Sequence, residues 1–146
     1  MLLKQVTVFL ENKPGALSAP CRLLADAGVN IQTFALADSR QFGLLRLVVA
    51  EWEKAVALLA GAGFAVKTTD VLALEMPDRP GGLAGIFAAL EKASLNVEYT
   101  YAFTVKWEGR GLVIFSVNNP AAAVPALKAA GISIVAPAEL LRRLAA

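Results

Sequence analysis

Hydrophobic and polar residues alternate over residues 4–11, where Val6, Val8 and Leu10 would share one face of an extended chain. This period of two predicts a half-buried strand. Over residues 17–27 the apolar positions recur every three or four residues instead, which predicts an amphipathic helix, and Gly28 is a typical helix terminator. The same patterns then predict strands at 29–37, 43–50 and 64–67 and a helix at 51–62. The first half therefore has the order strand, helix, strand, strand, helix, strand.

The second half has the same order of predicted elements. Strands are expected at 71–76, 95–105, 111–117 and 132–135, with helices at 83–92 and 121–130, a turn at 106–110 and an extra terminal helix at 137–144. Pro125 falls inside the second of these helices and is expected to kink it or delay its start. A link at 67–70, too short to let the halves move apart, joins them.

Residue identities repeat as well as elements. Pro14, Gly15, Leu17, Leu24 and Asn30 recur sixty-six residues later as Pro80, Gly81, Leu83, Leu90 and Asn96. Past the middle turn the spacing grows to sixty-eight, as from Gly43 to Gly111, which is how a duplicated fold unit accommodates an insertion in a surface turn. The fold class expected is α+β, with two ferredoxin-like βαββαβ units in tandem, at 1–69 and 70–146. Each unit would be an antiparallel four-stranded sheet with helices on one face, and the second carries the extra C-terminal helix.

Each unit contains a strand-to-helix junction suited to binding an anion. Pro14 lacks an amide hydrogen and fits the first helical turn, and Gly15 permits a close approach of backbone or ligand. Unpaired backbone N–H groups and the helix dipole would both favour negative charge there. A simple turn is the alternative for one such junction, but the junction occurs twice.

Composition removes several classes of function. The 146 residues are 57% apolar, carry a net charge of +2 and include Cys21 as the single cysteine and no histidine. An internal disulfide is impossible, a Cys/His metal site has no ligand set, and a cysteine nucleophile would have no imidazole base. The weak, mixed charge gives no electrostatic basis for nucleic-acid or membrane binding. The sequence has no signal-peptide layout and no apolar run of about 18 residues, so we expect a cytoplasmic protein. We also expect it to need no metal or cofactor.

The junctions share a pattern that reaches into the next strand. A polar residue and one further position precede Pro-Gly-x-Leu, and a small residue followed by x-Asn-Ile or x-Asn-Val opens the second strand. The first copy spans 12–17 with 28–31, and the second spans 78–83 with 94–97. This doubled pattern resembles the ACT domain, and the resemblance covers nearly the whole chain. It implies a small stand-alone tandem protein that binds an amino acid, for regulation, at interfaces between ACT units.

The resemblance also implies which residues bind the ligand. They are Asn12, Pro14, Gly15, Ala16, Leu17 and Asn30 in the first unit, and Asp78, Pro80, Gly81, Gly82, Leu83 and Asn96 in the second. The amides of both Pro-Gly-x-Leu segments would hold the ligand's carboxylate. Asp78 would accept a charge-assisted hydrogen bond from its ammonium, and Asn30 and Asn96 would add amide contacts.

Two positions depart from the family pattern. Asn12 stands where Asp is usual, so the first site should be weaker or used differently, and in that copy a capping and turn role without ligand is an alternative. Ser94 stands where Gly is usual, which matters more for ending the helix than for binding.

The function expected is a non-catalytic regulatory sensor of a free amino acid, assembled as a homodimer, with a regulated enzyme of unknown identity as a further partner. The alternative is a pure oligomerisation module that binds no small molecule. Catalysis is disfavoured because no histidine and no close pair of carboxylates is available. An RNA-binding protein of this topology would need aromatic residues on its middle strands, and 43–50 has none while 111–117 has Phe115 alone.

Overall fold

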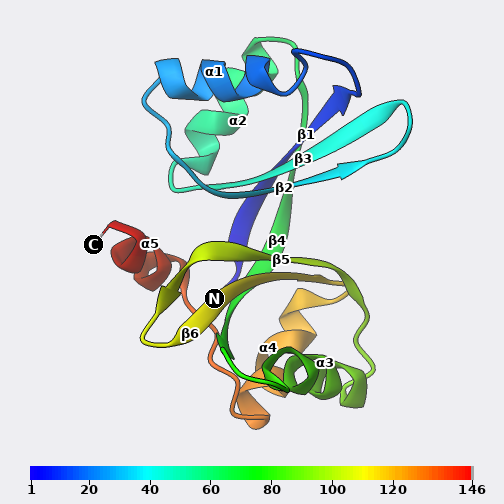
Figure 1. The fold of residues 1–146 in the computed structure, drawn as a ribbon, viewed down its shortest axis with the longest axis vertical. Coiled ribbons are helices and arrows are strands. Elements are labelled where there is room, and N and C mark those ends of the chain that lie inside the picture. Colours follow the sequence, from blue (N-terminus) through cyan, green and yellow to red (C-terminus); the bar gives the residue numbers. More distant parts are fainter. Residues whose placement is uncertain (146) are drawn as a thin grey trace. The chain divides into compact units, whose positions relative to one another are not determined.

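The computed structural model describes residues 1–145, apart from the side chain of Val105. The chain divides into two compact units, one formed by Lys4–Thr69 and the other by the chain from Asp70 onward together with Met1–Leu3. Both units are α+β, as Figure 1 shows. No helix in the described part of the chain has the length and apolar character needed to cross a bilayer.

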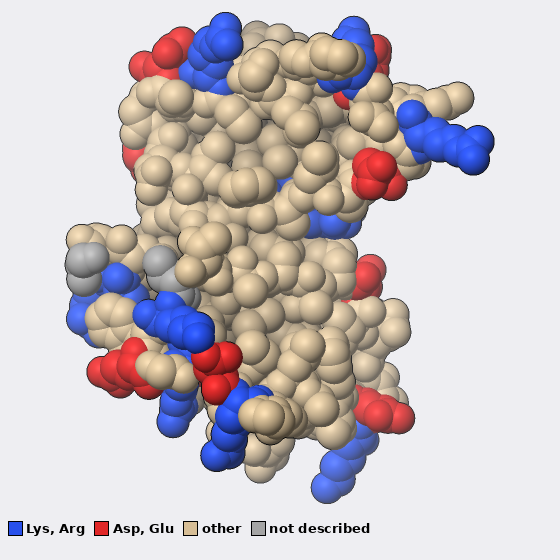
Figure 2. Space-filling view, in the orientation of Figure 1, with Lys and Arg blue, Asp and Glu red and all other residues tan. Residues whose placement is uncertain are grey.

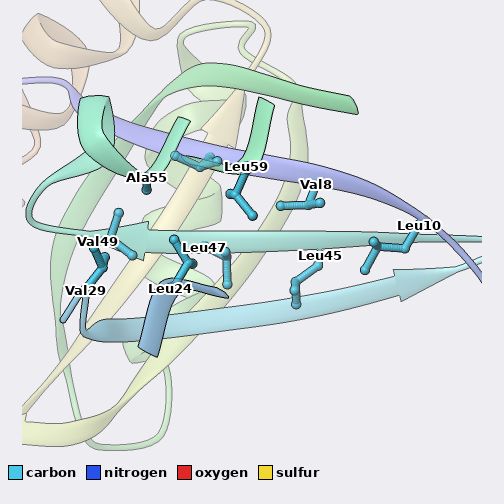
Figure 3. Close-up of a cluster of buried hydrophobic side chains, with 10 residues drawn as sticks. Val8, Leu10, Leu24, Val29, Leu45, Leu47, Val49, Ala55 and Leu59 are labelled. Carbon is cyan, nitrogen blue, oxygen red and sulfur yellow. The ribbon is translucent and has the colours of Figure 1, made fainter. Parts of the chain in front are cut away.

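The first unit is a four-stranded sheet covered by two helices. Its elements are β1 (Leu3–Glu11), α1 (Ser18–Asp26), β2 (Ile31–Asp38), β3 (Phe42–Val49), α2 (Trp52–Gly61) and the first part of β4 (Ala65–Pro77). The strands lie in the order β2-β3-β1-β4, so β2 is at an edge. Antiparallel pairing aligns Val8 with Leu45, and these side chains pack with Leu24 of α1 and Leu59 of α2 (Figure 3). Each fully buried leucine stabilises the unit by roughly 1.5–3 kcal/mol.

The second unit repeats this order of elements except for the last strand, and it adds a helix. It contains the rest of β4, α3 (Gly82–Lys92), β5 (Val97–Trp107), β6 (Arg110–Val117), α4 (Pro120–Ala129) and α5 (Pro137–Ala145). The strands lie in the order β4-β6-β5. Phe115 of β6 is fully buried in the core, and its ring meets Phe87 of α3 edge to face at 5.7 Å between centroids. The predicted fold class is confirmed.

The expected link at 67–70 is part of a strand. β4 runs without a break from Ala65 to Pro77, so these residues lie inside an extended segment of 13 residues. The link contains two threonines and neither Gly nor Pro, and β-branched residues favour the extended backbone. The expected break between two strands at 67–70 was therefore wrong, and the expectation that the link is too short to let the units move apart stays a prediction.

The strand expected at 132–135 is reduced to a single bridge. Ile134 pairs with Leu74, and two hydrogen bonds support the contact, from Glu75 N to Ser133 O at 3.0 Å and from Val135 N to Ala73 O at 2.8 Å. Pro137 comes soon after and cannot donate to a ladder, so the pairing stops there. The edge of β4 beyond Glu75 consequently borders a hollow rather than a fourth strand.

Pro125 lies inside α4, which nevertheless starts at Pro120, so the prediction of a delayed start was wrong, and the kink stays a prediction. The start is fixed by Asn119, whose Oδ1 accepts a hydrogen bond from Ala122 N at 3.1 Å, and by Pro120 in the first turn. Both residues are favourable at a helix N-terminus, so they set the boundary even with a proline later in the helix.

The turn between β5 and β6 is shorter than the predicted 106–110. It consists of Glu108 and Gly109, both with positive φ, of 50° and 74°. Positive φ at both positions is what a two-residue hairpin turn requires. As a result Trp107 pairs with Arg110, and Lys106 lies within the strand.

α5 is held by a set of charged side chains that we call the Arg143 network, consisting of Glu75, Arg110, Glu139 and Arg143. Arg143 Nη1 donates to Glu75 Oε1 at 2.6 Å, and its Nε donates to Glu139 Oε1 at 2.7 Å. Arg110 Nη1 donates to the other oxygen of Glu75 at 2.9 Å. The guanidinium of Arg143 also lies 5.5 Å from the ring centre of Trp107. The side chains of Glu75 and Arg143 are only 13% and 14% exposed, and around α5 basic and acidic atoms lie against one another in Figure 2.

The network predicts a pH dependence of stability. Hydrogen bonds from Arg142 and Arg143 lower the pKa of Glu139 to about 2, from an ordinary value of 4.5. Because the folded-state pKa is depressed, the stabilisation is complete above pH 4.5 and is lost as the pH falls toward 2. We expect Glu139→Gln to lower the Tm at pH 7, with the difference from the parent protein shrinking as the pH falls through this window. Thermal melts over this range test it, and a difference that stays constant with pH would contradict it.

Candidate ligand-binding site

The β4–α3 junction makes a tight turn that depends on two glycines. Gly81 has φ of 87°, a left-handed conformation that suits glycine, and Gly82 N donates to Arg79 O at 3.0 Å. A Cβ on Gly82 would lie 2.1 Å from Pro77 O, so the close approach of the two backbone segments excludes any larger residue without rearrangement. The turn brings α3 to its start at Gly82, immediately after the Pro-Gly pair.

The start of α3 leaves backbone donors available. Within the described residues, no acceptor is found for the amides of Leu83 and Ala84, whereas the amide of Gly82 is already used in the turn. These free N–H groups lie at the positive end of the helix dipole. The predicted carboxylate-binding role is therefore open to Leu83 but not to the Gly82 amide as the turn stands.

A hollow of about 420 Å³ opens beside this junction. The end of β4, the Arg79–Gly82 turn, the first turns of α3 and residues 130–133 line it. Three charged side chains are among its walls: Glu75, Arg79 and Arg110. Its volume is within the range of pockets for small metabolites, and it combines apolar walls with a few polar groups.

Asp78 lies beside this hollow rather than in its wall. Its carboxylate forms an ion pair with Lys106, and both side chains are substantially exposed, at 48% and 65%. Asp78 lines a neighbouring hollow of about 270 Å³ together with Arg79 and Arg110, which are shared by both. An exposed ion pair contributes little stability, so a ligand's ammonium could replace Lys106 at small cost.

Asn96 is not brought to the same place within its unit. It precedes β5, at the opposite end of α3 from Gly81 and Leu83, and eleven helical residues span about 16 Å. Its backbone N donates to Asn118 Oδ1 at 3.0 Å, and its carbonyl accepts from Asn118 N at 3.1 Å. These bonds tie the start of β5 to the end of β6. Pro80, by contrast, does line the hollow.

The first-unit junction has a different local structure. Gly15 again has a positive φ, of 84°, and Ala16 N donates to Lys13 O at 3.2 Å, but α1 begins only at Ser18. Asn12 donates from its backbone N to Gln41 O at 2.9 Å and from Nδ2 to Ser39 O at 3.4 Å. Asn12 therefore holds the junction against the β2–β3 turn, as the turn-and-cap alternative describes.

The cavity next to the first-unit junction is apolar. It has a volume of about 240 Å³ and is lined by Leu17, Cys21, Ile31, Phe34, Leu36, Leu45 and Leu47. Pro14, Gly15 and Asn30 are exposed, and none of them is part of this wall. Leu17 is the one predicted site residue that lines it, and it does so with an apolar side chain rather than a polar group.

Sequence reasoning missed Glu75, Arg79 and Arg110. Glu75 interrupts an otherwise apolar strand segment, Val71–Met76 in the sequence VLALEM, and an acid in such a place signals a buried partner. Arg110 is the first residue of β6, thirty-five residues away, and only the pairing of β4 with β6 shows that the two meet. Arg79 lies within the junction pattern itself, at its variable position.

Comparison with known proteins decides the family. The profile of the family described as "ACT domain pair" matches residues 1–143. The chain belongs to the ACT family. A solved structure, protein BT0572 from Bacteroides thetaiotaomicron, is 31% identical to this ACT domain pair, with 96% of each chain covered and a TM-score of 0.89. A search of curated protein sequences found no match.

More distant structures share the fold of this ACT domain pair. The regulatory subunit of aspartate kinase from Thermus thermophilus, in its ligand-free form, is 18% identical, with 87% of this chain and 91% of that chain covered and a TM-score of 0.62. The corresponding subunit from Thermus flavus is also 18% identical, with the same coverage and a TM-score of 0.60. Family membership supports a regulatory, ligand-binding role for the chain.

Proposed function

We propose that this ACT domain pair is a non-catalytic sensor that binds a free amino acid in the second-unit hollow. The observation that carries the proposal is the hollow of about 420 Å³ lined by the Arg79–Gly82 turn and by Gly85 and Ile86 of α3. The amides of Leu83 and Ala84, which lie between these lining residues in the sequence, have no acceptor among the described residues. An α-carboxylate placed there would receive two backbone hydrogen bonds and the favourable end of the helix dipole. Asp78, which lines the neighbouring hollow, would take the α-ammonium in exchange for Lys106.

The affinity expected from these contacts is moderate. Two or three charge-assisted hydrogen bonds contribute about 1.5–3 kcal/mol each. The cost of association offsets much of this, so the dissociation constant should be on the order of micromolar to millimolar. Such values suit a sensor of a metabolite.

Titration calorimetry of the full chain against the twenty amino acids tests the proposal. At least one should bind within the stated range, and Asp78→Asn should weaken it without changing the Tm by more than a degree or two, because Asp78 is exposed. If none of the twenty amino acids bound at millimolar concentration, the proposed sensor function would be overturned and the pure oligomerisation module would be favoured. Binding that is unchanged in Asp78→Asn would overturn only the ammonium assignment.

We further propose that the chain is a homodimer that pairs through the β2 edge of the first unit. β2 is an edge strand, and its Phe34 and Leu36 are 64% and 49% exposed. Exposed apolar side chains beside an unpaired strand edge favour association with a second copy. The assembly is compatible with a sensor and is also what the alternative function would require.

Phe34→Glu is expected to shift the chain to a monomer, since a carboxylate on this edge would have to be desolvated on association. Sedimentation velocity measures the shift. Phe42→Glu is the matched control, because Phe42 is similarly exposed, at 59%, but does not line the apolar cavity beside β2. The two variants sedimenting alike would show that this edge is not the interface.

A further inference from the structure

Some of the charged side chains that line the second-unit hollow have ion-pair partners, and one has none among the described residues. Glu75 is the only acid among its lining residues in the described part of the chain, and both its oxygens already accept from arginines, Arg110 at 2.9 Å and Arg143 at 2.6 Å. Its side chain is 13% exposed, so its negative charge is compensated and shielded. Glu75 is therefore a weak attractor for a cation in the hollow.

Arg79, in contrast, lines the hollow without a counter-ion. No ion pair or side-chain hydrogen bond of Arg79 is found among residues 1–145, and its side chain is exposed beside the Pro80–Gly81 turn. With Glu75 and Arg110 opposing one another, Arg79 leaves the lining with a net charge of +1. Glu108 and Asp78 border only the neighbouring hollow, and Asp78 is paired with Lys106.

The duplication shows that the Glu75–Arg110 ion pair is specific to the second unit, whereas Arg79 has a basic counterpart in Lys13. In the repeat, the position equivalent to Glu75 is Phe9, sixty-six residues earlier. The position equivalent to Arg110 is Phe42, sixty-eight residues earlier. The strand register agrees, because Phe42 pairs with Glu11 as Arg110 pairs with Pro77, again sixty-six residues later. Both phenylalanines are exposed, at 45% and 59%. One copy thus carries aromatic rings where the other carries an ion pair.

We propose that the second-unit hollow selects an amino acid whose side chain bears a second carboxylate, of the aspartate or glutamate class. This rests on the proposed function: the α-carboxylate lies at the start of α3, and the side-chain carboxylate is received by Arg79 and Arg110. Guanidinium groups are well suited to carboxylates because their donors can pair with both oxygens. A neutral side chain of the same size would leave Arg79 without a counter-ion.

Titration calorimetry of the full chain tests whether acidic amino acids are preferred over their amides. The ligands are L-aspartate, L-glutamate, L-asparagine and L-glutamine, each titrated in about 50 mM and in about 300 mM NaCl. The acidic amino acids should bind roughly 10- to 100-fold more tightly than their amides, because one or two charge-assisted bonds are gained. The preference should shrink at the higher salt concentration, since Arg79 is exposed.

Matched variants assign the preference to the hollow. Arg79→Gln should reduce the acid-over-amide ratio at least about fivefold, and Arg79→Lys should retain part of it because the charge remains. Arg142→Gln removes the same charge from α5, where Arg142 pairs with Glu139 and does not line the hollow, and should leave the ratio unchanged. An unchanged ratio in Arg79→Gln would overturn the assignment.

Different experimental results would overturn the acidic-ligand inference and the proposed sensor function. Aspartate and asparagine binding equally well would overturn the acidic-ligand inference while leaving an amino-acid sensor intact. Binding of succinate as tightly as aspartate would also overturn it, because a dicarboxylate without an ammonium would then suffice. Silence toward all twenty amino acids would instead overturn the proposed function itself.

Discussion

Replacing Arg143 with methionine is expected to lower the free energy of unfolding by about 2–3 kcal/mol. Arg143 is 14% exposed and donates to Glu75 at 2.6 Å and to Glu139 at 2.7 Å. Methionine keeps most of the apolar part of the arginine side chain, so the substitution mainly removes the positive charge. Glu75 stays shielded from water but loses one of its two arginine partners. Removing one member of a shielded ion pair is strongly destabilising because the remaining charge, here compensated only by Arg110, is less well satisfied. Urea unfolding measures the loss.

Arg142→Met is the matched control for this prediction. Arg142 is the preceding residue and also pairs with Glu139, but its side chain is 65% exposed. Exposed ion pairs contribute little, so the expected loss of stability is much smaller than for Arg143→Met. Equal effects of the two substitutions would show that α5 is not held through Arg143.

Replacing Gly82 with alanine is the second change expected to have a large effect. The added Cβ would lie 2.1 Å from Pro77 O, and a backbone oxygen cannot move aside as a flexible side chain can. The Arg79–Gly82 turn must then open, which overpacking data place at a cost of about 1–3 kcal/mol. Because this turn forms one wall of the hollow, amino-acid affinity should fall as well. Chemical unfolding and calorimetry on the same protein measure both effects.

Gly85→Ala provides a control of opposite sign. Gly85 lies inside α3, and nothing is within 4 Å of a Cβ built there. Alanine in a helix interior is more stable than glycine by roughly 0.5–1 kcal/mol. Stabilisation by Gly85→Ala together with destabilisation by Gly82→Ala would locate the cost in the turn, and similar losses in both would contradict that explanation.

The two junctions show how far a shared motif determines a shared structure. Both have a glycine with positive φ directly after proline, as the repeated Pro-Gly predicts. The next residue is Ala16 in one copy and Gly82 in the other. Only glycine fits the close contact with Pro77 O. The helix α3 starts at Gly82 itself, whereas α1 starts at Ser18, two residues after the equivalent Ala16. The two junctions thus share the Pro-Gly turn but differ in where the helix begins.

The sequence by itself determined the order of elements, the duplication, the α+β class and the two Pro-Gly junctions. These depend on local periodicity and on proline and glycine, whose backbone preferences act within a few residues. The tertiary structure decided that β4 is continuous through 67–70, that residues 132–135 barely pair, and that Glu75 meets Arg110 and Arg143. Those partners lie thirty-five and sixty-eight residues from Glu75. Ion pairing depends on distance in space, which local sequence patterns do not encode, so the charge of the hollow emerged only from the fold.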